Sequence, residues 1–261
     1  MSGAFVPPIR RREGMSWGKP THWYEDGNGQ KIPGVTSILS AGIPKPALVG
    51  WGIRSVAEYA INRWDDLDKI GPADRLKELK GSPYAERDAA ANRGTEVHAL
   101  AEQLVNGIEV DVPDALAGHV ESYVKFLDDW APVPVLTEVT VVNYTIGYAG
   151  TLDSVLDMAG QRWLADVKTS KGVYGETALQ CAAYARAEFY VDTDGTERPM
   201  IDVDRIACIH VRADGYDLRP LVFDDSVFLN FRYAAAVARA TNDIKSYVGE
   251  ALPTPRQEVL L

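Results

Sequence analysis

Cysteine is scarce in this chain of 261 residues, which contains only Cys181 and Cys208. Two cysteines without the spacing of a metal-binding pair exclude a disulfide framework, which needs several paired cysteines in a short chain. They indicate a protein of a reducing compartment, in which neither thiol defines a redox site.

Long apolar runs are also missing. No stretch approaches the roughly 18 apolar residues that a helix needs to cross a bilayer, and residues 1–14 lack the apolar run of a secretory signal. We therefore expect a cytoplasmic protein with no membrane partner.

Basic residues are outnumbered, with 27 Lys and Arg against 37 Asp and Glu and a net charge of −10. Proteins bind nucleic acid largely by neutralising phosphates with basic side chains, so the overall charge does not favour such a partner. A local basic surface or bound divalent cations can still supply positive charge. The run Arg10-Arg11-Arg12 is either a phosphate-binding arm or, more simply, a solvated terminal charge run, and the sequence leaves it unassigned.

The composition, 46% hydrophobic and 25% charged, is sufficient for one elaborated domain over residues 1–261. We expect residues 1–90 to form a hairpin at 22–32 and a helical elaboration with a helix at 47–64, and residues 93–190 to form the core. The other expected elements are helices at 83–106, 118–130, 177–190 and 226–247 and strands at 136–143, 205–212 and 217–222. This order predicts an α/β fold with a mixed central sheet flanked by helices.

Two segments rich in β-branched and aromatic residues, 151–158 and 162–168, predict a hairpin that turns at Ala159-Gly160. The register that places Asp157 opposite Arg162 also pairs Leu156 with Trp163, and both pairs are favourable across strands. The same register places Asp153 opposite Asp166.

Opposed carboxylates repel unless a cation lies between them or one takes up a proton. Lys168 follows Asp166 by two residues, so alternation along a strand directs its ammonium to the same face. A salt-bridged sheet surface would explain Asp166 and Lys168 taken alone. The second carboxylate, Asp153, favours a divalent cation site beside a lysine.

The segment 177–190 adds to this pattern. Leu179, Ala183 and Ala187 form an apolar stripe at helical spacing, while Gln180 and Tyr184 are an i,i+4 pair on an adjacent face. The pair is either an ordinary surface pair or part of the site that the hairpin predicts.

The order Gly-x-x-Asp (Gly150 to Asp153), Asp-x-Lys (Asp166 to Lys168) and Gln-x-x-x-Tyr (Gln180 to Tyr184) resembles the PD-(D/E)XK nuclease superfamily, and within it the RecB-like branch that includes viral recombination exonucleases. The resemblance covers residues 93–190, beginning at Arg93-Gly94-Thr95-Glu96-Val97-His98. The first ninety residues are similar, more weakly, to the leading segment of viral members. The resemblance to the superfamily implies a restriction-endonuclease-like fold.

The resemblance also implies roles for individual residues. Asp153, Asp166 and Lys168 would be catalytic, and Mg²⁺ or Mn²⁺ would be held by His98, Asp153, Asp166 and the main-chain carbonyl of Val167. Gln180 and Tyr184 would bind the substrate strand. Many relatives hold an iron–sulfur cluster on four cysteines, and with two cysteines this chain is expected to have none. Glu102 and Glu138 are equally explained as solvated residues and receive no role.

Three functions are compatible with these residues. The first is a DNA exonuclease acting on duplex ends or single strands in recombination, repair or replication, in the cytoplasm of a bacterial or virus-infected cell. Its partners would be DNA and a single-strand annealing or other recombination protein. The second is a structure-specific endonuclease on the same fold, and the third is a catalytically idle module that binds nucleic acid or a partner.

Overall fold

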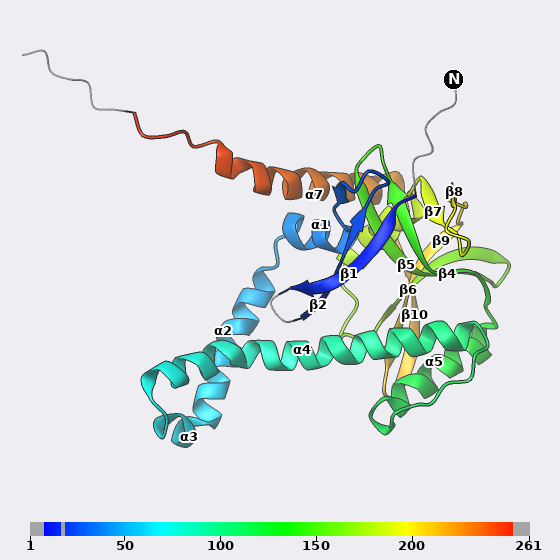
Figure 1. Cartoon of the computed structure of the whole chain (residues 1–261). Helices are drawn as coiled ribbons and strands as arrows, with labels where there is room; N and C mark the ends of the chain where they lie inside the picture. The colour runs from blue at the N-terminus through cyan, green and yellow to red at the C-terminus, as the bar shows by residue number, and fades with distance from the viewer. Residues whose placement is uncertain (1–7, 17–18, 253–261) are drawn as a thin grey trace, which may run out of the picture.

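The computed structural model describes residues 8–16 and 19–252 (Figure 1). A seven-stranded sheet has the order β10-β9-β6-β5-β4-β7-β8, in which β6 and β9 are parallel and the other neighbours are antiparallel. Its strands are β4 (Val133–Asn143), β5 (Tyr148–Met158), β6 (Gln161–Lys168), β7 (Phe189–Val191), β8 (Glu197–Pro199), β9 (Arg205–Arg212) and β10 (Gly215–Leu221). The fold is therefore mixed α/β, as the sequence predicts.

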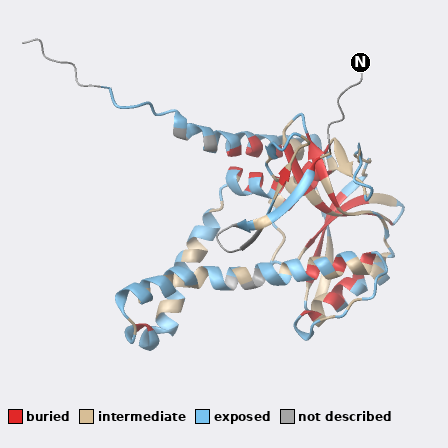
Figure 2. Cartoon of the chain, in the orientation of Figure 1, coloured by how far each residue is buried: buried red, intermediate tan, exposed pale blue. Residues whose placement is uncertain are grey.

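Helices cover both faces of this sheet. They are α1 (Val35–Gly42), α2 (Pro46–Asn62), α3 (Trp64–Asp68), α4 (Pro72–Val105), α5 (Ala117–Trp130), α6 (Glu176–Ala185) and α7 (Asp225–Asp243), with short 3-10 turns at Asp114–Leu116 and Ile244–Ser246. Alternation along β5 separates the two cores: Val155 packs with α1, α6 and α7, whereas Leu156 packs with α5 and the end of α4. Figure 2 shows the buried residues concentrated between the sheet and these helices.

The β5–β6 hairpin has the predicted register, with Asp157 opposite Arg162 and Leu156 opposite Trp163. Its turn is Ala159-Gly160, with φ of 50° and 74°, which suits a two-residue hairpin loop. The ladder between the strands runs from Met158–Gln161 to Ser154–Ala165. Asp153 and Asp166 follow immediately, at the end of the ladder.

The expected helix at 177–190 ends earlier, at Ala185. The amide of Glu188 donates to the carbonyl of Val142 at 2.8 Å, so the chain leaves the helix and joins the sheet as β7. Tertiary pairing with β4 therefore overrides the helical spacing of Ala187.

The expected helix at 83–106 is part of a longer one, because α4 begins at Pro72 and contains Pro83. Proline has no amide hydrogen for the carbonyl four residues earlier, which here belongs to Leu79. The hydroxyl of Ser82 donates to that carbonyl at 3.0 Å. Because this hydrogen bond replaces the missing one, the helix continues through Pro83, although the sequence predicts that a helix begins there.

The N-terminal residues form a second sheet of β1 (Arg10–Ser16), β2 (Lys19–Glu25) and β3 (Lys31–Ile32). Arg10–Arg12 therefore lie in a strand and not in an unstructured terminus, and all three are exposed, as the interpretation of a solvated charge run predicts. The sheet is fixed to the domain by Tyr24, whose hydroxyl lies 3.0 Å from Thr151 Oγ1, and by the Ala149 amide, which donates to Pro33.

Helices α2 and α3 and the first part of α4 extend away from the sheet as an arm (Figure 1). Helix α2 contains no buried residue, whereas Val97, Ala101 and Val105 in the last part of α4 are buried. The arm is therefore held mainly by contacts between its own helices, and α4 connects it to the region of the candidate site.

Close packing of α1 on α7 gives a test of the core. A Cβ at Gly42 would lie 2.2 Å from the carbonyl oxygen of Ala234, so Gly42→Ala should lower the free energy of unfolding by about 1–3 kcal/mol. At Gly52 in α2 a Cβ would meet nothing within 4 Å, so Gly52→Ala should raise it by about 0.5–1 kcal/mol. Urea denaturation of the two variants measures both effects, and equal midpoints would contradict the packing described.

Candidate functional site

The ends of β5 and β6 bring two carboxylates and a lysine together. Lys168 Nζ lies 2.6 Å from Asp166 Oδ2, and the Asp166 side chain is 1% exposed. Asp153 Oδ2 accepts a hydrogen bond from the main-chain amide of Val167 at 2.7 Å. The side chain of Val167 is buried in the core on the α5 face, so the backbone of this residue lies beside the carboxylates. Asp153, Asp166 and Lys168 thus share one site, as the hairpin predicts.

The charges of these three groups are interdependent. Burial and the neighbouring Asp153 raise the pKa of Asp166 to about 6, although Lys168 opposes the shift. Burial favours a higher pKa for Asp153 as well, but His98 and Lys168 outweigh this effect and hold its pKa below the ordinary value. At neutral pH both carboxylates are therefore mostly ionised, and Asp166 has the higher proton affinity of the two.

Lys168 is a fixed cation in this arrangement. Burial lowers its pKa, but Asp166 and Asp153 outweigh that effect and raise the pKa above its ordinary value. A general base needs a neutral amine near the working pH. The geometry therefore favours an electrostatic role for Lys168 over deprotonation of water.

His98 comes from α4 and lies on the other side of Asp153, with Nδ1 3.2 Å from Asp153 Oδ2. Burial lowers the pKa of His98, and the charge of Asp153 more than compensates, so the pKa is raised. The sequence places His98 near the site only through a family resemblance, and the structure brings it within ion-pair distance of Asp153.

Glu138 completes this side of the site and was not assigned from the sequence. Pairing of Thr137 with Ser154 and of Val139 with Leu152 places it opposite Asp153. Its φ of 50° is rare for a residue with a side chain. The β4–β5 register identifies Glu138, and the sequence alone does not predict that register.

Together these residues fit a divalent cation. One ligand atom from each of His98, Glu138 and Asp153 lies within 4.8 Å of the other two. Asp166 Oδ2 is buried, and the Lys168 ammonium lies 2.6 Å from it. Carboxylate oxygens suit Mg²⁺ and Mn²⁺, and an imidazole nitrogen is compatible with Mn²⁺. This group of three adds Glu138 to the predicted ligands and does not include Asp166. Ligation by these residues, by Asp166 and by the Val167 carbonyl stays a prediction.

Gln180 of α6 forms hydrogen bonds with residues of the site, and Tyr184 of the same helix contacts Gln180. Gln180 Nε2 donates to Asp166 Oδ1 at 2.9 Å and to the Tyr184 hydroxyl at 3.3 Å, and its Oε1 accepts from Lys168 at 3.4 Å. A Cβ at Gly150 would lie 2.4 Å from the Tyr184 ring. The glycine of Gly-x-x-Asp therefore makes room for the tyrosine of Gln-x-x-x-Tyr. Contact of this pair with a substrate stays a prediction.

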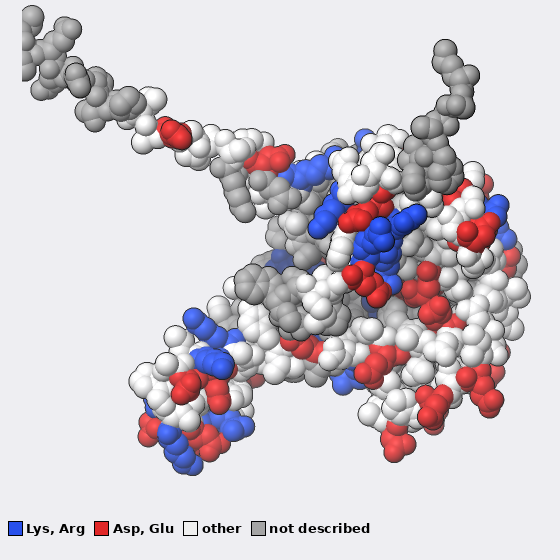
Figure 3. Space-filling view, in the orientation of Figure 1, with Lys and Arg blue, Asp and Glu red and all other residues white. Residues whose placement is uncertain are grey.

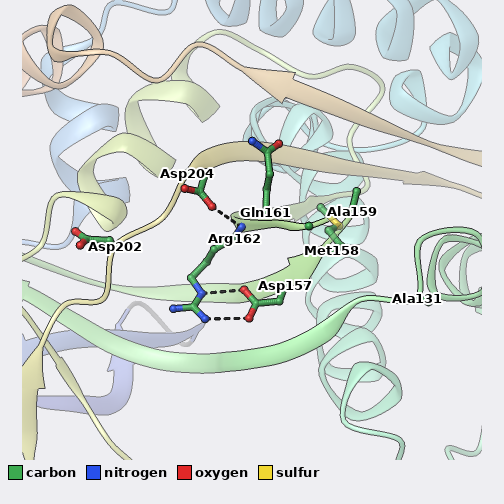
Figure 4. Close-up of a pocket in the computed structure, with 9 residues that line it drawn as sticks. Ala131, Asp157, Met158, Ala159, Gln161, Arg162, Asp202 and Asp204 are labelled. Carbon is green, nitrogen blue, oxygen red and sulfur yellow. Dashed lines mark hydrogen bonds and ion pairs between the residues drawn. The ribbon is translucent and has the colours of Figure 1, made fainter.

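These residues line a cleft of about 770 Å³ between the two sheets and α4. A second depression, of about 610 Å³, lies at the β5–β6 turn (Figure 4). There Arg162 donates to both oxygens of Asp157 at 2.8 and 2.9 Å, and its amide donates to Asp204. Because these charges are paired with one another, the cleft at Asp153 is the better candidate for chemistry.

The acidity of Glu138 gives a test of the cleft in metal-free protein. Burial and the charge of Asp153 raise its pKa from 4.5 to about 7. The folded state then binds the proton more tightly than the unfolded state, so this group makes stability fall as pH rises from about 4.5 to about 7. In EDTA, Glu138→Gln should therefore be more stable than the wild type at pH 8 by about 1–2 kcal/mol, a value discounted for partial exposure.

The gain should shrink as the pH approaches 5, where Glu138 is protonated in the folded state. Glu96→Gln, an exposed position on the same helix as His98, is the control and should show no such trend. A pH-independent difference for Glu138→Gln in urea titrations would contradict the assignment of Glu138 to the charged cluster.

Among residues 8–16 and 19–252, no helix has both the length and the apolar character to span a membrane. The sequence matches no protein-family model and no curated protein. One similar solved structure is the crystal structure of SSO0001, at 16% identity and a TM-score of 0.26. That match covers 53% of this chain and 63% of SSO0001.

Proposed function

We propose that this chain is a metal-dependent DNA exonuclease that hydrolyses phosphodiester bonds and belongs to the RecB-like branch of the PD-(D/E)XK superfamily. The observation that carries the proposal is the convergence of Asp153, Asp166 and Lys168 at one end of the hairpin. A structural salt bridge would need neither the second carboxylate, that of Asp153, nor the adjoining His98 and Glu138.

The cation would be held by His98, Glu138 and Asp153, with Asp166 on the adjoining side. When bound, it would stabilise negative charge on the phosphate and lower the pKa of water. Lys168 would place a permanent positive charge beside the same phosphate, where preorganised charge lowers the barrier because it need not reorient during the reaction.

Gln180 is a positioning residue in this proposal. Its amide group binds Asp166 and its carbonyl oxygen binds Lys168, so one side chain fixes the relative orientation of the acid and the cation. Tyr184 in turn contacts Gln180, and the absence of a side chain at Gly150 leaves space for its ring. The helix would therefore act on the reaction through the geometry of the Asp166–Lys168 pair.

The proposed substrate is DNA with an end, either duplex or single-stranded, and the proposed setting is recombination, repair or replication in the cytoplasm of a bacterial or virus-infected cell. A single-strand annealing or other recombination protein would be a second partner. These details are supported by the resemblance of the motifs, whereas the cleft supports the hydrolytic chemistry.

The test is digestion of linear duplex labelled separately at each 5′ and 3′ end, beside single strands and covalently closed circles, with Mg²⁺, Mn²⁺ or EDTA. We expect metal-dependent loss of the substrates that have ends, and the label released first gives the polarity. Cleavage of closed circles would replace the proposal by an endonuclease. Metal-dependent binding of DNA without cleavage would replace it by an idle module.

A further inference from the structure

Strand β1 carries three consecutive arginines beside the candidate cleft, and one of them lines it. Arg10, Arg11 and Arg12 of β1 are all exposed, and Figure 3 shows Lys and Arg side chains, with acidic side chains beside them, in the region of β1. Successive side chains of a strand point to opposite faces. Arg11 therefore differs in direction from its two neighbours.

Arg11 is the member that faces the cleft. It lines the cleft together with Tyr24, His98 and Asp153, and it is close enough to Glu138 to lower the pKa of that carboxyl, although burial and the acidic neighbours dominate. Arg12 points away from the cleft, where its Nε lies 3.1 Å from Glu25 Oε2.

The position of Arg11 relative to the carboxylates is fixed by a short series of contacts. Arg11 pairs with Tyr24 across β1 and β2, and Tyr24 is 3% exposed. The Tyr24 hydroxyl lies 3.0 Å from Thr151, which precedes Asp153 by two residues on β5. Strand β1, which carries the Arg11 guanidinium, is thus connected through β2 to β5, the strand that carries Asp153.

The guanidinium is also available to a ligand. Among the described residues that line the cleft, the Lys and Arg side chains are Lys168 and Arg11. Lys168 is engaged by Asp166 at 2.6 Å, whereas Arg11 has a longer contact, 3.4 Å, with Glu13, whose side chain is 74% exposed. Exposed ion pairs of this kind are weak, so Glu13 can be exchanged for a phosphate.

We infer that Arg11 binds a backbone phosphate of the DNA strand that enters the cleft, at a position away from the bond that is cut, and so positions the strand against Asp153 and Lys168. The inference rests on the proposed nuclease function. Arginine suits the role because its planar fork binds phosphate oxygens in pairs. Arg11 would also neutralise part of the phosphate charge in a protein whose net charge is −10.

The test compares Arg11→Gln, Arg11→Lys and the control Arg12→Gln. Binding is measured by fluorescence anisotropy in Mn²⁺ at several KCl concentrations, in a Lys168→Met background that slows cleavage by about 10²–10⁴-fold, so that little probe is cut during the measurement. The probe is a 20-nucleotide DNA, single-stranded or duplex, whichever form the wild type digests. The Michaelis constant KM and the turnover number kcat are measured without the Lys168 change.

Loss of one phosphate contact should reduce the slope of log K against log salt by about 0.7 for a single strand or about 0.9 for a duplex. At 0.1 M salt these slopes correspond to about fivefold or about eightfold weaker binding. Arg11→Gln should show this change and a similar rise in KM with little change in kcat. Arg11→Lys should recover most of the affinity, and Arg12→Gln should match the wild type.

A purely structural role for Arg11 would change the unfolding temperature or kcat and leave the salt slope unaltered, and that result would overturn the inference. If the wild type digests DNA but Arg11→Gln binds with the wild-type slope and KM, the inference is wrong while the nuclease function stands. If the wild type neither binds nor digests any DNA probe, both fail together.

Discussion

Lys168→Met is expected to lower the rate of DNA hydrolysis by about 10²–10⁴-fold while leaving the fold intact. The range is that measured when a preorganised charge or a proton-transfer group is removed from an active site. The loss should appear in kcat, because a fixed cation beside the reacting phosphate acts mainly in the transition state. End-labelled DNA and single-turnover conditions measure the chemical step directly.

The variant also leaves Asp166 without its ion-pair partner at a nearly inaccessible position. An unpaired buried carboxylate raises its own pKa and takes up a proton, so the variant should be closer to wild-type stability at pH 6 than at pH 8. Thermal unfolding at both pH values therefore separates a loss of chemistry from a loss of fold.

Lys45→Met is the matched control for Lys168→Met. Lys45 lies 2.8 Å from Glu176 in an ion pair of similar length whose acidic partner is more exposed than Asp166, and it does not line the cleft. It should retain wild-type turnover. If Lys168→Met, folded at pH 6, keeps more than about a tenth of the activity, Lys168 does not have the electrostatic role assigned to it.

The parts of this site that the sequence predicts are those fixed by local geometry. A two-residue turn and favourable cross-strand pairs determine the register of β5 and β6, and alternation along the strand then directs Asp153, Asp166 and Lys168 to one face. The i,i+4 spacing of Gln180 and Tyr184 is equally local, and their hydrogen bond follows from it.

The parts that the sequence does not predict depend on contacts between distant segments. Glu138 joins the site through the pairing of β4 with β5 and a backbone conformation that its residue type disfavours. Arg11 reaches the cleft because Tyr24 contacts Thr151, and α6 ends early because β7 pairs with β4. Periodicity within one segment contains no information about any of these contacts.

Asp153→Asn is expected to weaken Mn²⁺ binding by at least about 100-fold and to abolish metal-dependent hydrolysis. Changes to groups that merely support a metal ligand typically cost 10–100-fold in affinity, and loss of a charged ligand should cost more. Asp153 is the group common to the site, because it contacts His98 and the Val167 amide and lies with Glu138 in the cluster. Isothermal titration with Mn²⁺ measures the affinity.

The same change should lower the stability of the metal-free protein. Burial and the neighbouring carboxylates oppose the charge of Asp153, but His98 and Lys168 outweigh them and hold its pKa below the ordinary value. The ionised group therefore contributes stability above the pKa of the unfolded state, and this contribution is lost as the pH falls through the folded pKa. In EDTA at pH 8 the variant should unfold below the wild-type temperature, and the difference should shrink as the pH falls below about 4.

Addition of Mn²⁺ should stabilise the wild type but not Asp153→Asn. A ligand that binds only the folded state stabilises it by RT ln(1 + [L]/Kd), about 2.7 kcal/mol at 100 times Kd. The wild type and Asp157→Asn, which lies on the same strand but pairs with Arg162, should both gain this stabilisation from Mn²⁺. Asp153→Asn should gain almost none. An equal thermal shift in all three proteins would place the cation elsewhere and remove the chemical basis of the proposed function.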